Sequence, residues 1–310
     1  EYKKFFTRYL PYKSYVLENN QPIASTNFTK SSLDASNNFI KDSRYVERER
    51  FNHYDSEGKL LDFTSAQGQD QAFYRAYNNE NLIAISMNST YSESAHTSFE
   101  SELEERWRLK SYNFFDSDAF TGTSSRRVTR DISGQRFGPE VFLAEIDQNK
   151  KYKISAWVKT DPGFGNNKGR IKMCTFDING IGNSYPFFNV NTIPGVSREL
   201  TFSFGDSDGE WMYVEGIIDL PTAPPGVEWG INAFFANDDI SKDYLVDEIR
   251  IHPIDAQMET FTYKLPYGLS SKCDVRGQRI TYEYDNFGRL SLSRDHEGNI
   301  LQQTDYHYKN

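Results

Sequence analysis

The chain has 310 residues, of which 25% are charged and 37% are hydrophobic, and its formal net charge is −9 at pH 7. This composition is typical of a globular chain of about two domains, and the negative charge excludes nucleic acid as the expected partner, because phosphate contacts need a basic surface. No stretch approaches the roughly 20 apolar residues of a membrane-spanning helix, so we expect no membrane insertion. An aromatic content of 15% favours β-strands.

The first 96 residues predict extended structure. Residues 1–44 have no regular pattern, and we expect an irregular lead-in that joins the sheet formed by the residues after it. Residues 45–96 predict a meander of hairpins, because turn residues separate short apolar segments at 60–63, 72–77 and 82–87.

Residues 97–255 predict a β-sandwich, because short strands alternate with turns at regular spacing. The predicted strands span 152–159, 170–176, 198–204, 210–218, 229–235 and 244–252. Cys174 lies in this segment and Cys273 lies beyond it, so the sequence does not favour a disulfide between them.

Residues 256–310 predict further hairpins, in which Asp274, Asp285 and Asp295 each precede a glycine by three residues. An Asp at the first position of a turn can accept hydrogen bonds from backbone N–H groups two or three residues on, and the glycine adopts a positive φ without a steric clash. Alternating apolar and polar residues predict half-buried strands around the turns. Because so short a unit cannot bury a core alone, we expect each hairpin to stack on its neighbours.

A Y-D-x-x-G-[KR]-L pattern occurs in two places, with a partial copy after the second. Its residues are Tyr54, Asp55, Gly58, Lys59 and Leu60, then Tyr284, Asp285, Gly288, Arg289 and Leu290, then Asp295 and Gly298. In this pattern the chain resembles the Rhs/YD-repeat family. The resemblance implies a long β-sheet that spirals into a hollow shell on secreted or surface proteins, in some members around a C-terminal toxin. We expect the chain to be a fragment of a much longer protein; the alternative is several unrelated hairpins with ordinary turns.

Residues 97–255 carry the landmarks of another family. In chain order these are Phe99-Glu100, Trp107, the turn at 121–125, a Y-x-x-S-x-W-x-K strand at 152–159, and L-V-D-E-I at 245–249. Their order resembles the galactose-binding-like jelly rolls of many carbohydrate-binding modules. The predicted fold is therefore all-β, a YD-repeat hairpin sheet plus a β-sandwich jelly roll inserted between its hairpins. Insertion is tolerated because the termini of a sandwich can lie close together, and it requires residues 45–96 and 256–310 to share one sheet.

The jelly-roll resemblance implies one structural Ca²⁺ between the first and last strands. Its ligands would be the side chains of Glu100 and Asp247, with backbone oxygens from Thr121 to Ser125. Ca²⁺ takes six to eight oxygen ligands and often mixes carboxylates with carbonyls. The alternative is an ion pair of Glu100 with a neighbouring arginine, or simple solvation.

Glycan binding requires exposed aromatic platforms beside planar polar groups. We expect Trp107, Trp157 and Trp211 to lie in the core instead. The candidate glycan contacts lie on the other face of strand 229–235 and nearby, at Asn232, Phe234, Tyr185, Phe187 and Arg170. The alternative is that these residues pack against the YD sheet or cover the sandwich.

Catalysis is not predicted. The sequence contains no H-E-x-x-H, G-x-S-x-G or C-x-x-C motif, and its five histidines are scattered. The main hypothesis is a non-enzymatic structural fragment of a large secreted or cell-surface bacterial protein, with the jelly roll decorating or closing a shell. The alternatives are a glycan-binding adhesin module and the encapsulating part of a polymorphic toxin. The expected partners are the remainder of the same long chain, glycans, and a secretion or surface-anchoring complex.

Overall fold

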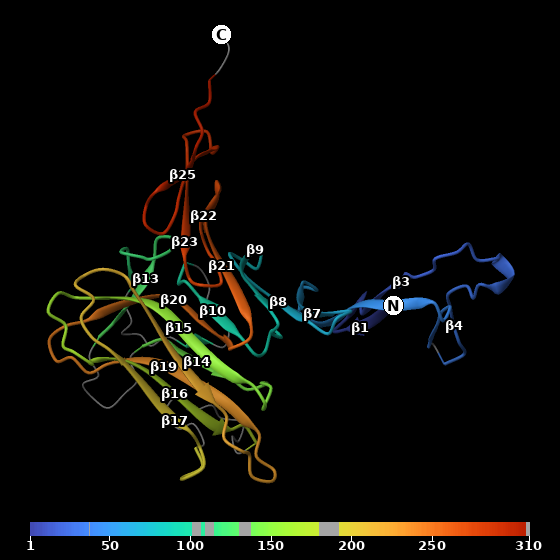
Figure 1. Ribbon diagram of the computed structural model, residues 1–310, viewed down its shortest axis with the longest axis horizontal. Coiled ribbons are helices and arrows are strands. Elements are labelled where there is room, and N and C mark those ends of the chain that lie inside the picture. The colour runs from blue at the N-terminus through green and yellow to red at the C-terminus, as the bar shows by residue number, and fades with distance from the viewer. Residues whose placement is uncertain (37, 101–106, 109–114, 130–137, 180–191, 308–310) are drawn as a thin grey trace. The chain divides into compact units, whose positions relative to one another are not determined.

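The computed structural model describes the chain except for residues 37, 101–106, 109–114, 130–137, 180–191 and 308–310. The fold is all-β, as the sequence predicts, with a short 3₁₀ helix η1 (Ser25–Asn27) (Figure 1). In the described part of the chain, no helix is long and apolar enough to cross a membrane. Contacts divide the chain into two compact units: unit 1 is Glu1–Phe73 with Met87–Tyr91, and unit 2 is Tyr74–Ser86 with Ser92–Asn310.

Unit 1 contains two small hairpins and an antiparallel meander. The hairpins are β1 (Tyr2–Phe5) with β2 (Arg8–Pro11), and β4 (Ser32–Leu33) with β5 (Phe39–Ile40). The meander has the order β3 (Lys13–Leu17), β6 (Tyr45–Tyr54), β7 (Leu60–Ser65) and the start of β8 (Asp70–Ala76).

Aromatic rings hold the strands of unit 1 together. The Tyr54 hydroxyl donates to the Pro11 carbonyl at 2.7 Å, and the Tyr54 ring lies 5.0 Å from the Phe5 ring. Phe63 stacks on Phe73 at a centroid distance of 6.0 Å. Cross-strand ring pairs such as Phe63 and Phe73 contribute roughly 0.2–1 kcal/mol each. The contacts of Tyr54 with Phe5 and Pro11 pack the predicted lead-in, residues 1–44, against the meander.

The Asp-x-x-Gly turns share one hydrogen-bond pattern. In the turns that begin at Asp55, Asp274, Asp285 and Asp295, Oδ1 accepts the N–H groups of the second and fourth residues on, at 2.8–3.0 Å. The glycines have φ between 76° and 87°. The sequence analysis expected the Asp side chain to accept N–H groups two or three residues on. The N–H group three residues on belongs to the glycine, and it donates to the Asp backbone carbonyl instead, at 3.0–3.1 Å. Each turn is therefore closed by its own side chain and backbone.

Unit 2 contains the β-sandwich. One layer, the β20 sheet, has the order β12 (Phe115–Asp116), β13 (Ser125–Val128), β20 (Tyr244–Pro253), β15 (Lys151–Thr160) and β18 (Met212–Asp219), and β10 (Ala95–Thr97) also pairs with β20. The other layer, the β19 sheet, has the order β11 (Trp107–Arg108), β14 (Glu140–Leu143), β19 (Trp229–Asn237), β16 (Gly169–Asp177) and β17 (Glu199–Phe204).

The sandwich core lies between these sheets. Alternate residues of each strand enter it, as the period of two requires; from the β20 sheet they include Ile154, Val158 and Ile251, and from the β19 sheet Ile171, Ile231 and Phe235. Trp107 belongs to this core, as predicted. Phe99 and Glu100, which the sequence analysis placed on the first strand, lie after the end of β10, and Phe99 has a φ of 60°.

The remaining strands of unit 2 form the hairpins. Their order is β9 (Asn81–Met87), β21 (Gln257–Lys264), β22 (Gly268–Cys273), β23 (Arg279–Tyr284), β24 (Leu290–Arg294) and β25 (Ile300–Gln303). β9 precedes the sandwich in sequence and β21 follows it, yet the Tyr263 hydroxyl on β21 donates to the Leu82 carbonyl on β9 at 2.8 Å. The sandwich therefore leaves and rejoins one sheet.

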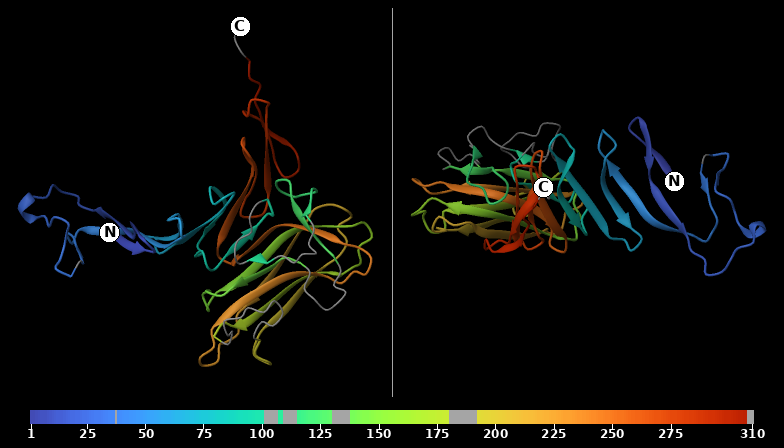
Figure 2. Two further views of the ribbon diagram at one scale, coloured as in Figure 1. Left: turned by 180° about the vertical axis from the view of Figure 1, so that it is seen from behind. Right: turned by 90° about the horizontal axis from the view of Figure 1, so that it is seen from above.

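The outer face of the β20 sheet is hydrogen-bonded to these hairpins. In both side views the β20 sheet lies between the hairpin strands and the β19 sheet (Figures 1 and 2). The Arg250 guanidinium on β20 donates to the carbonyls of Met258 and Asp274, at 3.1 and 2.7 Å, and to the Thr260 hydroxyl at 2.9 Å. The same guanidinium pairs with Glu248 at 3.4 Å, and both side chains are at most 5% exposed.

An aromatic cluster extends the same contact. Trp157 stacks on Phe120 at 4.0 Å, Trp211 lies 6.0 Å from Phe120, and the Arg279 guanidinium of β23 lies 4.5 Å above the Phe120 ring. The prediction of core positions for Trp157 and Trp211 is wrong. A β-bulge between Ser155 and Trp157 shifts the register with β20, and Trp157 lies on the outer face against the hairpins.

Candidate functional site

The face of the β19 sheet that points away from the core carries a mixed polar and aromatic surface. Core residues such as Val141, Met173 and Ile231 alternate along their strands with residues of the opposite face. That face, called here the β19 face, consists of Glu140 and Phe142 from β14, Asn232 and Phe234 from β19, and Arg170, Lys172, Cys174 and Phe176 from β16.

Strand register arranges the β19 face in cross-strand rows. One row places Glu140 opposite Phe234, and Phe234 opposite Lys172. The next row places Phe142 opposite Asn232, and Asn232 opposite Cys174. Directly opposed residues lie within about 4.5–5.5 Å between their Cβ atoms, so a carboxylate, an amide and an ammonium group meet among aromatic rings.

The polar centre of this face is buried. The Asn232 amide donates to Glu140 Oε1 at 2.9 Å and to the Val141 carbonyl at 3.2 Å, and Asn232 and Glu140 are 0% and 2% exposed. The Lys172 ammonium lies 5.9 Å from the centre of the Phe234 ring. Burying a carboxylate is costly unless hydrogen bonds compensate it. The hydrogen bond from the Asn232 amide contributes to that compensation and orients the carboxylate.

The predicted glycan contacts are brought together only in part. Arg170, Asn232 and Phe234 share the β19 face, but Asn232 is fully buried and Phe234 is 7% exposed, so they do not form the open platform that the sequence analysis required. The Arg170 guanidinium is held by Asp238 and by the Ser203 hydroxyl, the latter at 2.9 Å. Tyr185 and Phe187 lie outside the described residues.

The sequence analysis did not identify two side chains of the β19 face, Glu140 and Lys172. Glu140 stands in a strand that was not predicted, although the alternation of Glu140 and Phe142 with Val141 and Leu143 is a strand signal. Lys172 lies in a predicted strand, but its position beside Phe234 depends on the pairing of β16 with β19. Pairing between strands distant in sequence cannot be derived from either strand alone.

The predicted calcium ligands gather at the turn of residues 120–124. The Thr121 N–H donates to Asp247 Oδ2 at 2.8 Å, and the Thr121 hydroxyl donates to Glu248 Oε1 at 2.9 Å. Glu100 Oε1 accepts the N–H groups of Thr123 and Ser124, at 2.6 and 2.5 Å. Three carboxylates therefore surround one turn.

The backbone is strained on both sides of this turn. Glu248 has a φ of 50° and sits in the bulge of β20, and Phe99, directly before Glu100, also has a left-handed φ. Such conformations cost roughly 1–3 kcal/mol each at non-glycine residues and concentrate at functional sites. The Ser125 hydroxyl donates to the Asp118 carbonyl at 2.6 Å, and the backbone oxygens from Thr121 to Ser125 stay predicted ligands.

Electrostatics disfavour so much negative charge at one turn. Burial raises the pKa of Asp247 well above its ordinary value, and the neighbouring Glu248 carboxylate raises it further. Burial also raises the pKa of Glu100. Among the described residues, no group of three His, Cys, Asp or Glu side chains is placed to hold a metal ion. Oxygen donors of this kind nevertheless suit Ca²⁺, and a cation would relieve the repulsion.

The second copy of the YD pattern makes contacts within the hairpins. Tyr284 donates through its hydroxyl to the Leu269 carbonyl at 2.9 Å and stacks on Tyr267 at 6.2 Å. Arg289 pairs with Asp285 at 2.6 Å and lies 4.0 Å above the Tyr306 ring. These contacts close one hairpin on the next.

Comparison with known proteins gives structural matches only. No protein-family model and no curated protein matches the chain. The CBM22-1 xylan-binding domain of Paenibacillus barcinonensis Xyn10C is 18% identical, over 51% of this chain and 92% of that one, with a TM-score of 0.35. The family 11 carbohydrate-binding module of Clostridium thermocellum, in complex with a β-1,3-1,4-mixed-linked tetrasaccharide, is 18% identical over 52% and 95%, with a TM-score of 0.31. At these TM-scores the similarity does not decide the function.

Proposed function

We propose that the chain is a non-catalytic glycan-binding protein, in which the sandwich binds a neutral glycan through the β19 face and the hairpins hold the sandwich in place. The observation that carries the proposal is the set of half-buried side chains on this face, Arg170, Lys172 and Phe142, beside the buried hydrogen bond between Asn232 and Glu140. The proposal also makes the chain a part of a secreted or cell-surface protein, where glycans are met.

The chemistry of the β19 face suits a sugar. Sugar hydroxyls both donate and accept hydrogen bonds, a carboxylate accepts them, and an amide does both. The half-buried ring of Phe142 adds apolar surface on this face, and the rings of Phe176 and Phe234 are buried beside the carboxylate of Glu140 and the amide of Asn232. Ligand sites combine such apolar walls with a few fixed polar groups.

The position of this face supports the same proposal. The outer face of the β20 sheet is occupied by Arg250, Trp157 and the hairpins they contact. The β19 sheet lies on the far side of the sandwich from those hairpins (Figure 1). Its side chains stand on strands rather than loops, which limits the reorganisation that binding requires.

A matched pair of lysines tests the proposal. The full chain is run through native gels that contain arabinoxylan, barley β-glucan or galactomannan, and its retardation is compared with that of Lys172→Ala and Lys153→Ala. Lys172 lies on the β19 face, whereas Lys153 lies on β15 near Glu215, at 3.9 Å. We expect Lys172→Ala to weaken retardation and Lys153→Ala to leave it unchanged. Equal retardation of both variants, or none of the native chain, would refute the proposal.

A structural scaffold is the second candidate function, and the repeated Asp-x-x-Gly turns favour it. Their common hydrogen bonds and the stacking of each hairpin on the next suit a sheet that continues by repetition, as in the Rhs/YD-repeat shells. Hydrogen exchange of the full chain tests it. The amides of β21 to β24 should exchange as slowly as those of β20 when no glycan is present, and fast exchange would contradict a scaffold role.

A further inference from the structure

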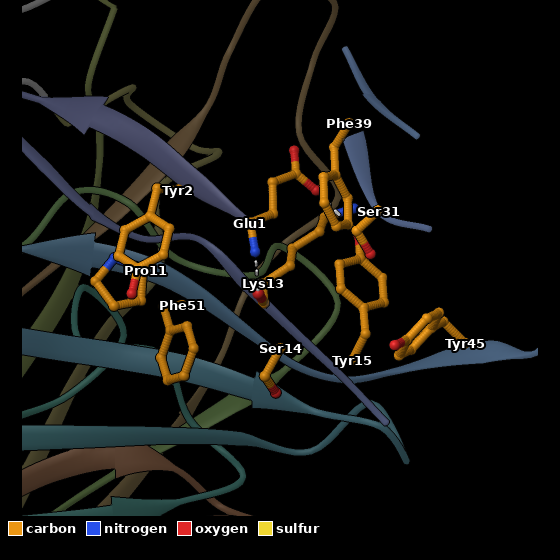
Figure 3. Close-up of a pocket in the computed structure, with 10 residues that line it drawn as sticks. All are labelled: Glu1, Tyr2, Pro11, Lys13, Ser14, Tyr15, Ser31, Phe39, Tyr45 and Phe51. Carbon is orange, nitrogen blue, oxygen red and sulfur yellow. Dashed lines mark hydrogen bonds between the residues drawn. The ribbon is translucent and has the colours of Figure 1, made fainter. Parts of the chain in front are cut away.

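Unit 1 contains a pocket whose walls are mainly aromatic. It lies among β1, β2, β3, β5 and β6, and it encloses about 390 Å³ (Figure 3). Small-molecule sites typically enclose about 300–1,000 Å³ and combine apolar walls with a few polar groups. The sequence analysis assigned no function to residues 1–44, which supply most of this lining.

The aromatic rings form two walls. Tyr2 and Phe51 lie with Pro11 on one side of the pocket, and Phe39, Tyr15 and Tyr45 lie on the other (Figure 3). The rings of Tyr15 and Phe39 stack with a centroid distance of 5.9 Å and an interplanar angle of 29°. The second wall is therefore a continuous aromatic surface, held by β3 and β5.

Polar groups lie between the walls and already interact with one another or with neighbouring side chains. The Lys13 ammonium lies 3.0 Å from the Glu47 carboxylate, and the Ser14 hydroxyl donates to Glu49 at 3.0 Å. The Tyr15 hydroxyl donates to a carboxylate oxygen of Glu1 at 3.0 Å. Because the Lys13 ammonium pairs with Glu47 and the Glu1 α-ammonium donates to the Lys13 carbonyl at 2.9 Å, the pocket offers no strong attraction to an anion. It offers both donors and acceptors to a neutral ligand.

We propose that this pocket binds a sugar ring of a neutral glycan, as a second site separate from the β19 face. A pyranose has apolar C–H surfaces that fit the aromatic walls and hydroxyls that match the mixed donors and acceptors between them. A phosphate or carboxylate ligand would meet the carboxylates of Glu1 and Glu47.

Tyr2 and Phe6 give a matched pair of variants in one hairpin. Both side chains are exposed, by 69% and 65%, so removing either ring should not unfold the chain, but only Tyr2 lines the pocket. The full chain, Tyr2→Ala and Phe6→Ala are titrated with soluble arabinoxylan and barley β-glucan oligosaccharides. Tyr2→Ala should weaken one class of sites about tenfold, the scale of losing one aromatic anchor. Phe6→Ala should change that affinity less than about twofold, because its ring makes no pocket contact.

Hydrogen exchange separates this site from the β19 face. Bound oligosaccharide should slow exchange in residues 2–15 and 39–51, and Tyr2→Ala should remove that protection while leaving any protection of residues 138–143 and 230–236. Protection confined to the sandwich would overturn the pocket proposal and leave the β19 face intact. Protection confined to unit 1 would support the pocket proposal and contradict glycan binding at the β19 face. A proline-rich peptide that binds and protects unit 1 where the oligosaccharides do not would overturn the assignment to a sugar.

Discussion

The two outer faces of the sandwich both bury charged side chains, but they give them different partners. On the β20 side, Glu248 pairs with the Arg250 guanidinium, which also binds the backbone carbonyls of two hairpin residues. On the β19 side, Glu140 accepts a hydrogen bond from the neutral amide of Asn232.

This difference in partners distinguishes a buried carboxylate that stabilises the fold from one that can contact a ligand. A buried carboxylate that is matched by a guanidinium and by fixed carbonyls has its hydrogen-bonding capacity used within the fold, and removing one partner is strongly destabilising. The amide of Asn232 orients the Glu140 carboxylate, and we propose that this carboxylate accepts a hydrogen bond from a ligand hydroxyl. The first arrangement joins the sandwich to the hairpins, and the second suits a site.

Removal of Arg250 should have the largest effect. Arg250→Met leaves Glu248 buried without its guanidinium and should lower the free energy of unfolding by about 3–5 kcal/mol. The control is Arg198→Ala, whose pairing with Asp219 at 2.7 Å lies at the surface and should cost at most about 1 kcal/mol. Urea unfolding of both variants measures the difference, and equal losses would mean that the Arg250 network does not fasten the hairpins.

Acid should lower the free energy of unfolding through two buried histidines of the β20 sheet. Burial lowers the pKa of His96 and His252 to about 4, below the value of about 6.5 in the unfolded chain. Their neutral forms therefore contribute stability that is complete above pH 6.5 and is lost as the pH falls toward 4. At pH 5 the loss should be about 2 kcal/mol for each histidine. Urea unfolding at pH 7 and pH 5 measures it, and His96→Gln should remove about half; an unchanged pH dependence would contradict the burial of His96.

A methyl group at Gly122 should disturb the carboxylate turn. Gly122 has a φ of 62°, and a Cβ there would lie 2.3 Å from the Glu100 carboxyl carbon. Gly122→Ala should therefore cost roughly 2–3 kcal/mol, from backbone strain and from displacement of Glu100. Gly163→Ala is the control, because its φ is 78° but nothing lies within 4 Å, and strain alone should cost about 1 kcal/mol. Thermal unfolding distinguishes them, and equal losses would show that Glu100 moves freely.

Calcium should have the smallest effect on stability, and one substitution tests whether Asp247 binds it. We propose that Ca²⁺ binds at Glu100 and Asp247, so an ion concentration of ten times the dissociation constant should stabilise the fold by about 1.4 kcal/mol relative to chelator. Asp247→Asn should remove this response. In chelator, Asp247→Asn should not stabilise the fold, because both carboxylate oxygens accept backbone N–H groups, from Thr121 and Glu248, and the single amide oxygen of Asn replaces only one of these acceptors. A calcium response that survives Asp247→Asn would rule out this site.

Local chemistry explains which parts of the molecule the sequence predicts. The turns at Asp55, Asp285 and Asp295 follow from an Asp and a Gly three residues apart, and their geometry needs no distant residue. The sandwich strands follow from alternation, and β15, β16 and β20 lie within one or two residues of their predicted ranges.

Tertiary pairing explains what the sequence does not predict. Trp157 faces the hairpins because a bulge shifts its register, and Lys172 meets Phe234 only through the pairing of β16 with β19. The pocket of unit 1 is likewise assembled from rings of several strands, such as Tyr2 and Phe51. None of these neighbours is adjacent in sequence.

The most direct measurement of the central claim is calorimetric titration of the full chain and of Glu140→Gln with the oligosaccharide that retards the native chain. The substitution keeps the shape of the side chain and an acceptor for the Asn232 amide, but it removes the carboxylate charge. We predict that Glu140→Gln weakens the sandwich site at least about tenfold, since hydrogen bonds to a charged group are worth roughly 1.5–3 kcal/mol. Unchanged affinity in a folded variant would contradict the assignment of the β19 face as the glycan site.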